Sequence, residues 1–434
     1  MRYFVGKPTR RELLAIAGTG FLPTWAQQDK RDYDESKVRH YTLPDPLKLS
    51  NGRPVTSPSM WTRQRKPELL RLFAENIYGR APGRTKSVRI EQTSFRSDAL
   101  EGKARRKLVT IRFDRERPDP SMQLLIYLPR EQRRTKLFLG INFRGNHTVT
   151  DEKDIPLTTK WVYANGRASV DHHATDAGRG MQKSQWPVEQ ILARGYGLAT
   201  FYSGDLSPDW DGGFPEGIEP LFYRPGQTKR DPDEWGAIAA WAWGLSRAMD
   251  YLARDGDIDP HGVFVMGHSR MGKTALWAGA SDPRFAMVIS NCSGAGGATL
   301  ARRRFGESVK DLNNHFPWWF CENYAKFSDN EDALPVDQHE LIALSAPRPI
   351  YIAVAEQDLG SDPKGQFLSA LSASPVYRLF GTDGLAVSEM PPVHQPVMSR
   401  IGFHMRAGKH DITPYDWDQY MNFADKYAGA TDTR

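Results

Sequence analysis

The chain has 434 residues, of which 39% are hydrophobic and 25% are charged, a balance typical of a globular protein with a sizeable core. Its formal net charge of +6 is small for this length and is spread along the chain. This argues against a nucleic-acid partner, because such a protein usually carries a concentrated basic stripe. The basic stretches at 105–107 and 302–304 are expected to be solvated surface.

Residues 1–26 predict a twin-arginine export signal. A basic start with Arg10 and Arg11 precedes an apolar run, and the small residue Ala26 comes before a polar switch at Gln27. An amphipathic first helix is the alternative, but the run after Glu12 has no charged residues, and its apolar residues would not lie on one face of a helix. We therefore expect an exported protein, periplasmic or extracellular. No other run reaches the ~18 apolar residues of a membrane helix, so no membrane partner is expected.

Residues 27–434 are predicted to form a single domain. Residues 27–60 are polar and rich in proline, and the stretch 65–83 has the apolar spacing of an amphipathic helix that ends at Gly-Arg-Ala-Pro-Gly. This predicts an N-terminal segment, about 27–100, that wraps the surface.

From there, strand-like runs alternate with helix-like runs. We expect strands at 107–113, 122–129, 136–146, 197–203, 262–267, 287–294, 348–358 and 400–408, and helices at 187–196, 234–254 and 414–428. This alternation predicts an α/β protein with a doubly wound, mostly parallel sheet, whose ligands bind at the carboxyl ends of the strands.

Two connections, 145–188 and 203–234, are too long for simple crossovers. Both are rich in Trp, Tyr, Asp, Gly and Pro. They are expected either to line a cleft that is suited to sugar rings or simply to cover the core.

Residues 267–274, Gly-His-Ser-Arg-Met-Gly-Lys-Thr, match two motifs. The letters satisfy the phosphate-binding P-loop, but a P-loop needs small residues that turn tightly, whereas His268, Arg270 and Met271 are bulky. The stretch also places Ser269 between a strand-like and a helix-like run, which is the setting of a hydrolase nucleophile elbow. Glycine comes one position later than in G-x-S-x-G, so this motif alone is weak.

The residues that follow Ser269 strengthen the elbow interpretation, because α/β-hydrolases order their triad Ser, acid, His. Asp358 at the end of a strand is the candidate acid, with Asp337 as a loop alternative. His410, between the last strand and the last helix, is the candidate base. The other histidines after the serine are His315, His339, His394 and His404.

At this point the residues resemble carbohydrate esterase family 15, the glucuronoyl esterases, and especially their bacterial members. The resemblance is dense from about 262 to 427, through "GHSRMGKTALWAGASDPRFA", "SNCSGAGGATLARRRFGE", "WFCENYAKF", "LPVDQHELIALSAPRPIYIAVAEQD", "DPKGQFL", "PVYRLFG" and "GKHDITPYDW". It is looser from about 43, through "RPVTSPSMW", "LFAENIYGRAPG" and "INFRGNH".

The resemblance implies a three-layer α/β-hydrolase fold with extended loops and no metal or cofactor. It also implies a serine esterase that cleaves, through an acyl-enzyme, the ester between 4-O-methyl-glucuronic acid on xylan and an alcohol of lignin. Ser269 is then the nucleophile, His410 the base and Asp358 the acid, while Arg270 donates its side chain and backbone N–H to the oxyanion. The partner would be a glucuronoxylan or lignin–carbohydrate ester, and the protein would be a monomer.

Three further residues are implied to bind the substrate. Lys273, one helical turn after the serine, would reach the uronate hydroxyls, and Glu307 would be the sugar-binding glutamate. Trp318 or Trp319 would pack on the sugar or fill the pocket wall.

Two departures from the family affect these expectations. Cys292 stands where many members carry a catalytic glutamate, so the acid role falls on Asp358. Gly360 replaces a tryptophan that is expected at the sugar, which puts substrate preference in question. Cys292 and Cys321 either pair or remain as buried thiols. The rival functions are a xylan deacetylase with the same triad and a non-catalytic glycan-binding protein.

Overall fold

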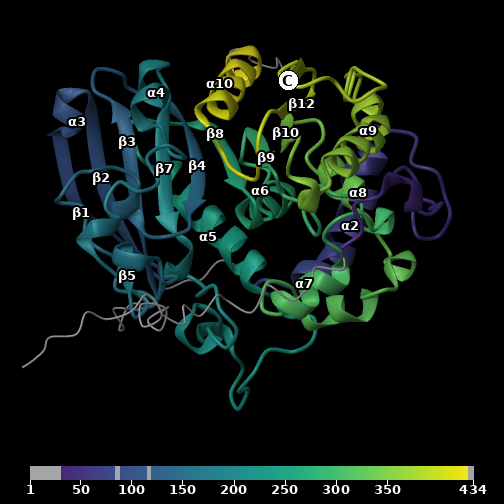
Figure 1. Ribbon diagram of the computed structural model, residues 1–434, viewed down its shortest axis with the longest axis horizontal. Helices are drawn as coiled ribbons and strands as arrows, with labels where there is room; N and C mark the ends of the chain where they lie inside the picture. The colour runs from purple at the N-terminus through teal and green to yellow at the C-terminus, as the bar shows by residue number, and fades with distance from the viewer. Residues whose placement is uncertain (1–30, 84–87, 115–118, 429–434) are drawn as a thin grey trace, which may run out of the picture.

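A computed structural model describes residues 31–83, 88–114 and 119–428 (Figure 1). The predicted export signal lies outside the described residues. Among the helices that are described, none is both long enough and apolar enough to cross a membrane.

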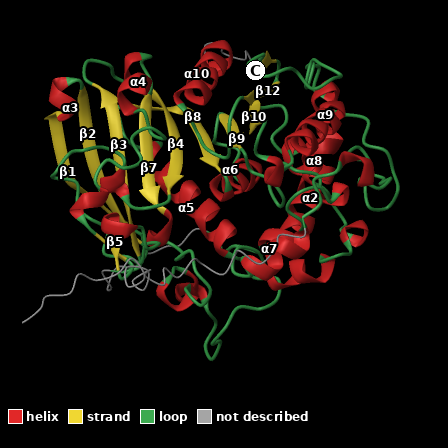
Figure 2. Cartoon of the chain, viewed as in Figure 1, coloured by secondary structure: helices red, strands yellow, loops and turns green. Residues whose placement is uncertain are grey.

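A ten-stranded sheet runs through the middle of the molecule (Figure 2). Its order is β1-β2-β3-β7-β4-β8-β9-β10-β12-β11. The six strands from β7 to β12 are parallel, whereas β1, β2 and β3 join antiparallel at one edge and β11 at the other. The bounds are β1 Arg89–Asp98, β2 Ala104–Arg112, β3 Ser121–Pro129, β4 Thr135–Asn142, β7 Gly197–Tyr202, β8 Ile258–His268, β9 Met287–Asn291, β10 Ile350–Ala355, β11 Val397–Met398 and β12 Ile401–Arg406. The predicted mostly parallel α/β sheet is confirmed.

Helices cover both faces of this sheet, as the two apolar cores show. In β8, Val263 and Val265 pack into one core, whereas Phe264 and Met266 pack into the other. This alternation is the period of two of a strand that is buried on both faces. The first core includes helices α2 (Lys66–Phe73), α5 (Ala237–Leu252), α6 (Arg270–Ser281), α8 (Gln338–Ala343) and α9 (Pro363–Leu379), and the second includes α4 (Val188–Ala193) and α10 (Pro414–Ala428). The result is the three-layer α/β-hydrolase architecture.

Shorter elements complete the chain. Helices α1 (Pro58–Met60), α3 (Ala99–Gly102) and α7 (Val309–His315) are short, and a small hairpin joins β5 (Ser169–Val170) to β6 (His173–Ala174). The predicted helix at 65–83 is α2 flanked by two π-helical turns, Trp61–Arg65 and Ala74–Tyr78. Most of the long connections 145–188 and 203–234 is 3-10 turns and irregular backbone.

The prediction that the basic stretches are solvated is wrong. Arg106 is fully buried, with Glu152 and Asp154 as ion-pair partners. Arg302 and Arg303 are buried as well, against the carboxylates Asp337 and Asp362 respectively. Each guanidinium tolerates burial because a carboxylate from a distant part of the chain compensates its charge.

Candidate active site

Ser269 occupies a strained turn between β8 and α6. Its φ of 58° and ψ of −130° are values that a residue with a side chain rarely adopts. The turn is possible because both flanking glycines lie in close contact with backbone: a Cβ on Gly267 would lie 1.9 Å from the Met271 carbonyl oxygen, and one on Gly272 would lie 3.1 Å from the Asn291 carbonyl oxygen. This is the geometry of a nucleophile elbow, in which the hydroxyl is presented at the end of the sheet.

The same turn is unsuited to phosphate. The backbone N–H of Ser269 donates to the Asn291 carbonyl at 2.9 Å, and those of Gly272 and Lys273 donate to the Ser269 carbonyl. A P-loop needs successive N–H groups that are free to face phosphate oxygens. The first two N–H groups of α6, on Arg270 and Met271, have no carbonyl acceptor within the helix and can serve an oxyanion instead.

Asp358 and His410 meet beside this elbow. β10 and β12 are parallel neighbours, so the loops after them lie at the same edge of the sheet. His410 Nδ1 donates to Asp358 Oδ2 at 2.7 Å, and the His410 ring lies 4.6 Å from the ring of His268, the neighbour of Ser269. Burial would raise the pKa of Asp358, but hydrogen bonds from His410, Ser361 and Cys292 more than offset it, so the pKa lies below its ordinary value. An ionised Asp358 can hold the proton of His410 on Nδ1.

The alternative acid and bases have structural roles. Asp337 caps α8 and is fully buried beside Arg302. His404 lies inside β12, and His339 Nε2 donates to the Pro44 carbonyl. His315 ends α7 and His394 Nε2 accepts from the Ala407 N–H. Of the candidate pairs, the structure therefore brings together Asp358 and His410.

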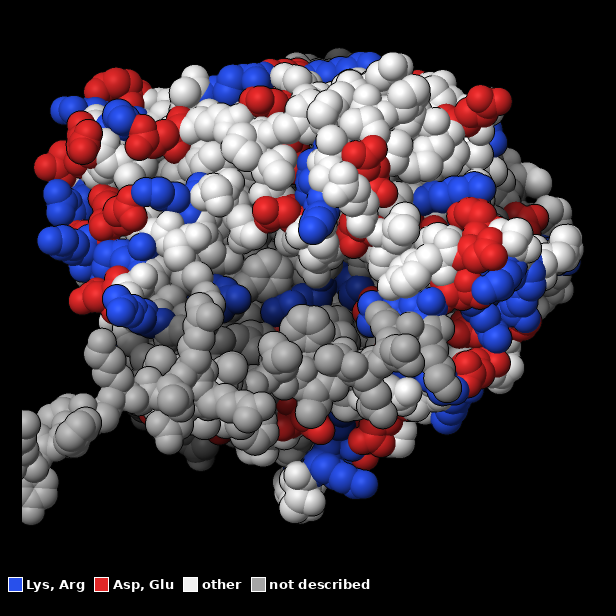
Figure 3. All heavy atoms as spheres, in the orientation of Figure 1, with Lys and Arg blue, Asp and Glu red and all other residues white. Residues whose placement is uncertain are grey.

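Arg270 is held over the site by Asp209. Its Nε lies 2.5 Å from Asp209 Oδ2, and its guanidinium stacks over the rings of Phe143 at 4.6 Å and Trp319 at 5.6 Å. The other oxygen, Asp209 Oδ1, accepts the indole N–H groups of Trp318 at 2.9 Å and Trp319 at 2.7 Å. The cation is thus fixed beside the elbow, and a fixed cation in such a place is able to stabilise an oxyanion. Figure 3 shows Lys and Arg atoms at the floor of a hollow near the middle of the molecular face that it draws.

Lys273 and Glu307 lie together below the elbow. Lys273 is buried, its Nζ donates to the Ser293 carbonyl at 2.7 Å, and it lies 3.7 Å from Glu307 Oε2. Burial lowers the pKa of Lys273, and the charges of Glu307 and Asp358 oppose that shift. The third predicted substrate residue, Trp318, lines a cavity of about 780 Å³ with Phe214 and Tyr223.

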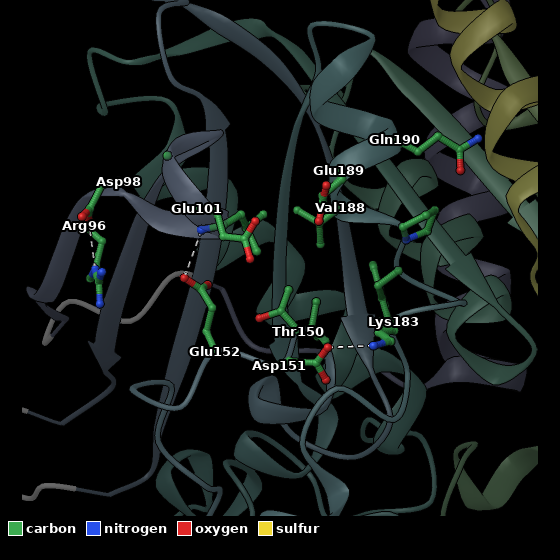
Figure 4. A pocket seen from close by; sticks show the side chains of 15 residues that line it. Arg96, Asp98, Glu101, Thr150, Asp151, Glu152, Lys183, Val188, Glu189 and Gln190 are labelled. Carbon is green, nitrogen blue, oxygen red and sulfur yellow. Dashed lines mark hydrogen bonds and ion pairs between the residues drawn. The ribbon is translucent and has the colours of Figure 1, made fainter.

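A larger cavity, about 880 Å³, lies away from these residues, between α3 and α4. Figure 4 shows two ion pairs among the side chains that line it, Lys183 with Asp151 and Arg96 with Asp98. The predicted catalytic residues do not line it. Cavity size therefore does not locate the chemistry in this protein.

Comparison with known proteins agrees with this geometry. A family model described as "Glucuronyl esterase, fungi" matches residues 227–381. The carbohydrate esterase MZ0003 from an unknown prokaryotic organism is 47% identical over 422 residues, 96% of this chain and 97% of that protein. The glucuronoyl esterase of Solibacter usitatus superposes with a TM-score of 0.87 at 48% identity, over 91% of this chain and all of that chain. The chain belongs to carbohydrate esterase family 15, the glucuronoyl esterases.

Fungal relatives match a shorter part of this esterase. The 4-O-methyl-glucuronoyl methylesterase of Podospora anserina is 41% identical over 128 residues, 27% of this chain and 26% of that protein. The resemblance that the sequence motifs indicate is therefore confirmed at the level of the family.

Cys292, the first departure from the family pattern, lies beside Asp358 and His410. The residue is fully buried in the left-handed region (φ 46°), and its Sγ lies within 4.8 Å of a carboxylate oxygen of Asp358 and a ring nitrogen of His410. Burial raises its pKa well above the ordinary value, so it stays a neutral donor beside the ionised acid. Among the described residues, Cys292, Asp358 and His410 are the one group of three His, Cys, Asp or Glu side chains whose possible metal-ligand atoms all lie within 4.8 Å of one another. The hydrogen bond between His410 and Asp358 holds two of the three together. Both cysteines of the esterase are free thiols, which settles the open question of their pairing.

Gly360, the second departure, joins two loops of the site. Its carbonyl accepts the backbone N–H of Glu307 at 2.9 Å, so the loop that carries this glutamate is tied to the loop that follows Asp358. Asp209 lies in the long connection 203–234, and no sequence motif points to it. The only signal in the sequence was an aspartate among aromatic residues in that long loop.

Proposed function

We propose that this protein hydrolyses 4-O-methyl-glucuronoyl esters that link xylan to lignin alcohols. The observation that carries the proposal is the strained Ser269 beside the His410–Asp358 pair, with Arg270 fixed over the same turn by Asp209. Relatives that are named 4-O-methyl-glucuronoyl methylesterase, and a close bacterial relative named glucuronoyl esterase, support the choice of substrate.

The first half of the reaction forms an acyl-enzyme. Ser269 Oγ attacks the uronate carbonyl carbon while His410 Nε2 takes the hydroxyl proton. Asp358 keeps the remaining proton of the imidazolium on Nδ1 and stabilises its charge. The carbonyl oxygen becomes an oxyanion that accepts from Arg270, and the C–O bond to the alcohol then breaks as His410 returns its proton to the leaving oxygen.

The second half releases the acid. Water gives its proton to His410 and attacks the acyl carbon, and the bond to Ser269 Oγ breaks as the proton returns to the serine. Glu307 can accept from a sugar hydroxyl and Lys273 can donate to one, which favours a uronate over a plain acetate in the acyl site.

Hydrolysis of benzyl glucuronate by wild type and Ser269→Ala tests the proposal, with acetylated xylan as the comparison substrate. We expect turnover of the glucuronate ester that exceeds acetate release and is lost in the alanine variant. Dominant acetate release would identify the protein as a deacetylase. An absence of Ser269-dependent turnover on both substrates, with xylan binding retained, would identify a glycan-binding protein.

We also propose that the protein is exported through its twin-arginine signal and acts as a monomer. Arg10, Arg11 and the apolar run that ends at Ala26 support export of the folded chain. Cell fractionation of the wild type and of the double variant Arg10→Lys, Arg11→Lys tests the route, and light scattering on the purified protein tests the mass. Equal export of both forms would contradict the twin-arginine route, and a dimer mass would contradict the monomer.

A further inference from the structure

A buried cluster of Asp416, His404 and Arg406 lies outside the triad, beneath the loop that carries His410. Asp416 in the first turn of α10 is fully buried. Its Oδ1 accepts from His404 Nε2 at 2.9 Å and from Asn291 Nδ2 at 3.0 Å. Its Oδ2 accepts from Arg406 Nε at 2.9 Å and from both the backbone N–H and the hydroxyl of Thr413.

Arg406 connects this carboxylate to the backbone around the catalytic base. Its Nη1 donates to the Ala407 carbonyl at 2.9 Å, and its Nη2 donates to the carbonyls of Lys409 at 2.8 Å and Asp411 at 2.5 Å. These carbonyls lie on both sides of His410. Because a guanidinium is a rigid planar fork, one buried side chain fixes the path of the whole loop.

Asn291 connects the same carboxylate to the nucleophile elbow. Its Nδ2 donates to Asp416 and to Tyr420 Oη at 2.6 Å, so its Oδ1 is left to accept from His268 Nδ1 at 2.7 Å. Its backbone carbonyl accepts the N–H of Ser269 at 2.9 Å. Asn291 is therefore a single-residue link between Asp416 and the nucleophile elbow.

The charges in this network suit the reaction. Burial pushes the pKa of Asp416 upward, but the hydrogen bond and charge of His404, together with Thr413 and Arg406, lower it below its ordinary value, so the carboxylate is ionised. Burial lowers the pKa of His268 to about 3. A neutral ring therefore lies against the ring of His410, which gains a positive charge during catalysis.

We infer that Asp416 and Arg406 are positioning residues that set the geometry between His410 and Ser269 without touching the substrate. Asp416 is bonded through Arg406 to the loop of the base and through Asn291 to the turn of the nucleophile. The inference rests on serine-esterase chemistry and does not depend on which ester is the natural substrate.

Two substitutions test it. In Asp416→Asn, an amide replaces a carboxylate whose oxygens accept up to three hydrogen bonds each. In Arg406→Lys, the positive charge remains, but the planar guanidinium with its several N–H donors is lost. We expect kcat to fall about 100-fold in both, with KM within about threefold, because a misplacement of about 1 Å between reacting groups has that effect. The rate at which a small fluorophosphonate modifies Ser269 should fall by the same factor, and this measurement needs no sugar binding.

Asp282→Asn is the matched control. Asp282 is also a buried carboxylate paired with an arginine, Arg284, but it lies at the opposite end of α6, about 20 Å along the helix from Ser269. We expect this variant to lose thermal stability and to keep kcat per folded molecule. If Asp416→Asn does not fold, Thr413→Val removes one hydroxyl donor and should lower the fluorophosphonate rate about threefold or more. Unchanged fluorophosphonate rates in the folded variants would overturn the inference.

Discussion

The carboxylate of Asp209 holds the guanidinium of Arg270 at 2.5 Å and, through its other oxygen, the indole N–H groups of two adjacent tryptophans. Arg270 is the residue that distinguishes this elbow from an ordinary hydrolase elbow. An aspartate from a loop that is distant in sequence therefore fixes Arg270, the residue that we propose as the oxyanion donor. The loop 203–234 thus contacts the proposed active site through Asp209.

Asp209→Asn should lower kcat about 10- to 100-fold, because Arg270 loses its charged anchor and an oxyanion donor depends on fixed geometry. Asp211→Asn, an exposed aspartate in the same loop, is the control and should retain full activity. Steady-state kinetics on benzyl glucuronate measure both. Equal rates for the two variants would show that Asp209 does not hold the oxyanion donor.

Asp358→Asn should lower kcat about 10⁴-fold, because an amide in place of this carboxylate leaves His410 in the wrong tautomer. Asp337→Asn should instead lower the melting temperature, since Asp337 caps α8 and binds Arg302. Its kcat per folded molecule should be unchanged. The reverse pattern would make Asp337 the catalytic acid.

Lys273→Met should raise KM for a glucuronate ester about tenfold or more, because Glu307 and the sugar hydroxyls lose a buried cationic partner. Hydrolysis of p-nitrophenyl acetate, which has no such hydroxyls, should change less than about threefold. Comparing the two substrates on one preparation controls for folding. A parallel loss on both would assign Lys273 a structural role.

Neither thiol should react with iodoacetamide in the native protein at pH 8. Burial raises the pKa of Cys321 to about 11 and that of Cys292 well above its ordinary value, so both remain protonated and shielded. Mass spectrometry should find no alkylation before denaturation in urea and two adducts after it. Rapid native alkylation of Cys292 with loss of activity would contradict its buried place beside Asp358.

Glu219 should make the folded state less stable as pH rises. Burial raises its pKa from 4.5 to about 7, so the folded state holds a proton that the unfolded chain has already released between these values. The stability that the folded state has while Glu219 is protonated is fully present below about pH 4.5 and is lost as the pH rises through about 7. Glu219→Gln should therefore leave the free energy of unfolding unchanged at pH 4 and raise it by up to about 3 kcal/mol at pH 8. Denaturant unfolding at the two pH values measures this, and an equal effect at both would exclude the titration.

Local patterns in the chain predict most of what positions the triad. Buried strands are recognisable as apolar runs, and Ser269, Asp358 and His410 each lie within a few residues of the end of such a run. Since the carboxyl ends of parallel strands share one edge of the sheet, their meeting can be expected without coordinates. The edge strand β1 is different: most of its residues are exposed or half-buried, so it carries no comparable apolar signal and is absent from the predicted elements.

The tertiary structure alone decided the partners of charged groups. Asp209 beside Arg270, Asp416 beside Asn291, and the carboxylates that compensate the buried arginines at 106, 302 and 303 are brought to their partners from distant parts of the chain. A charged residue looks the same in a sequence whether it faces water or a buried counter-charge. Only packing, which brings remote segments within hydrogen-bond distance and excludes water between them, determines which of the two it does.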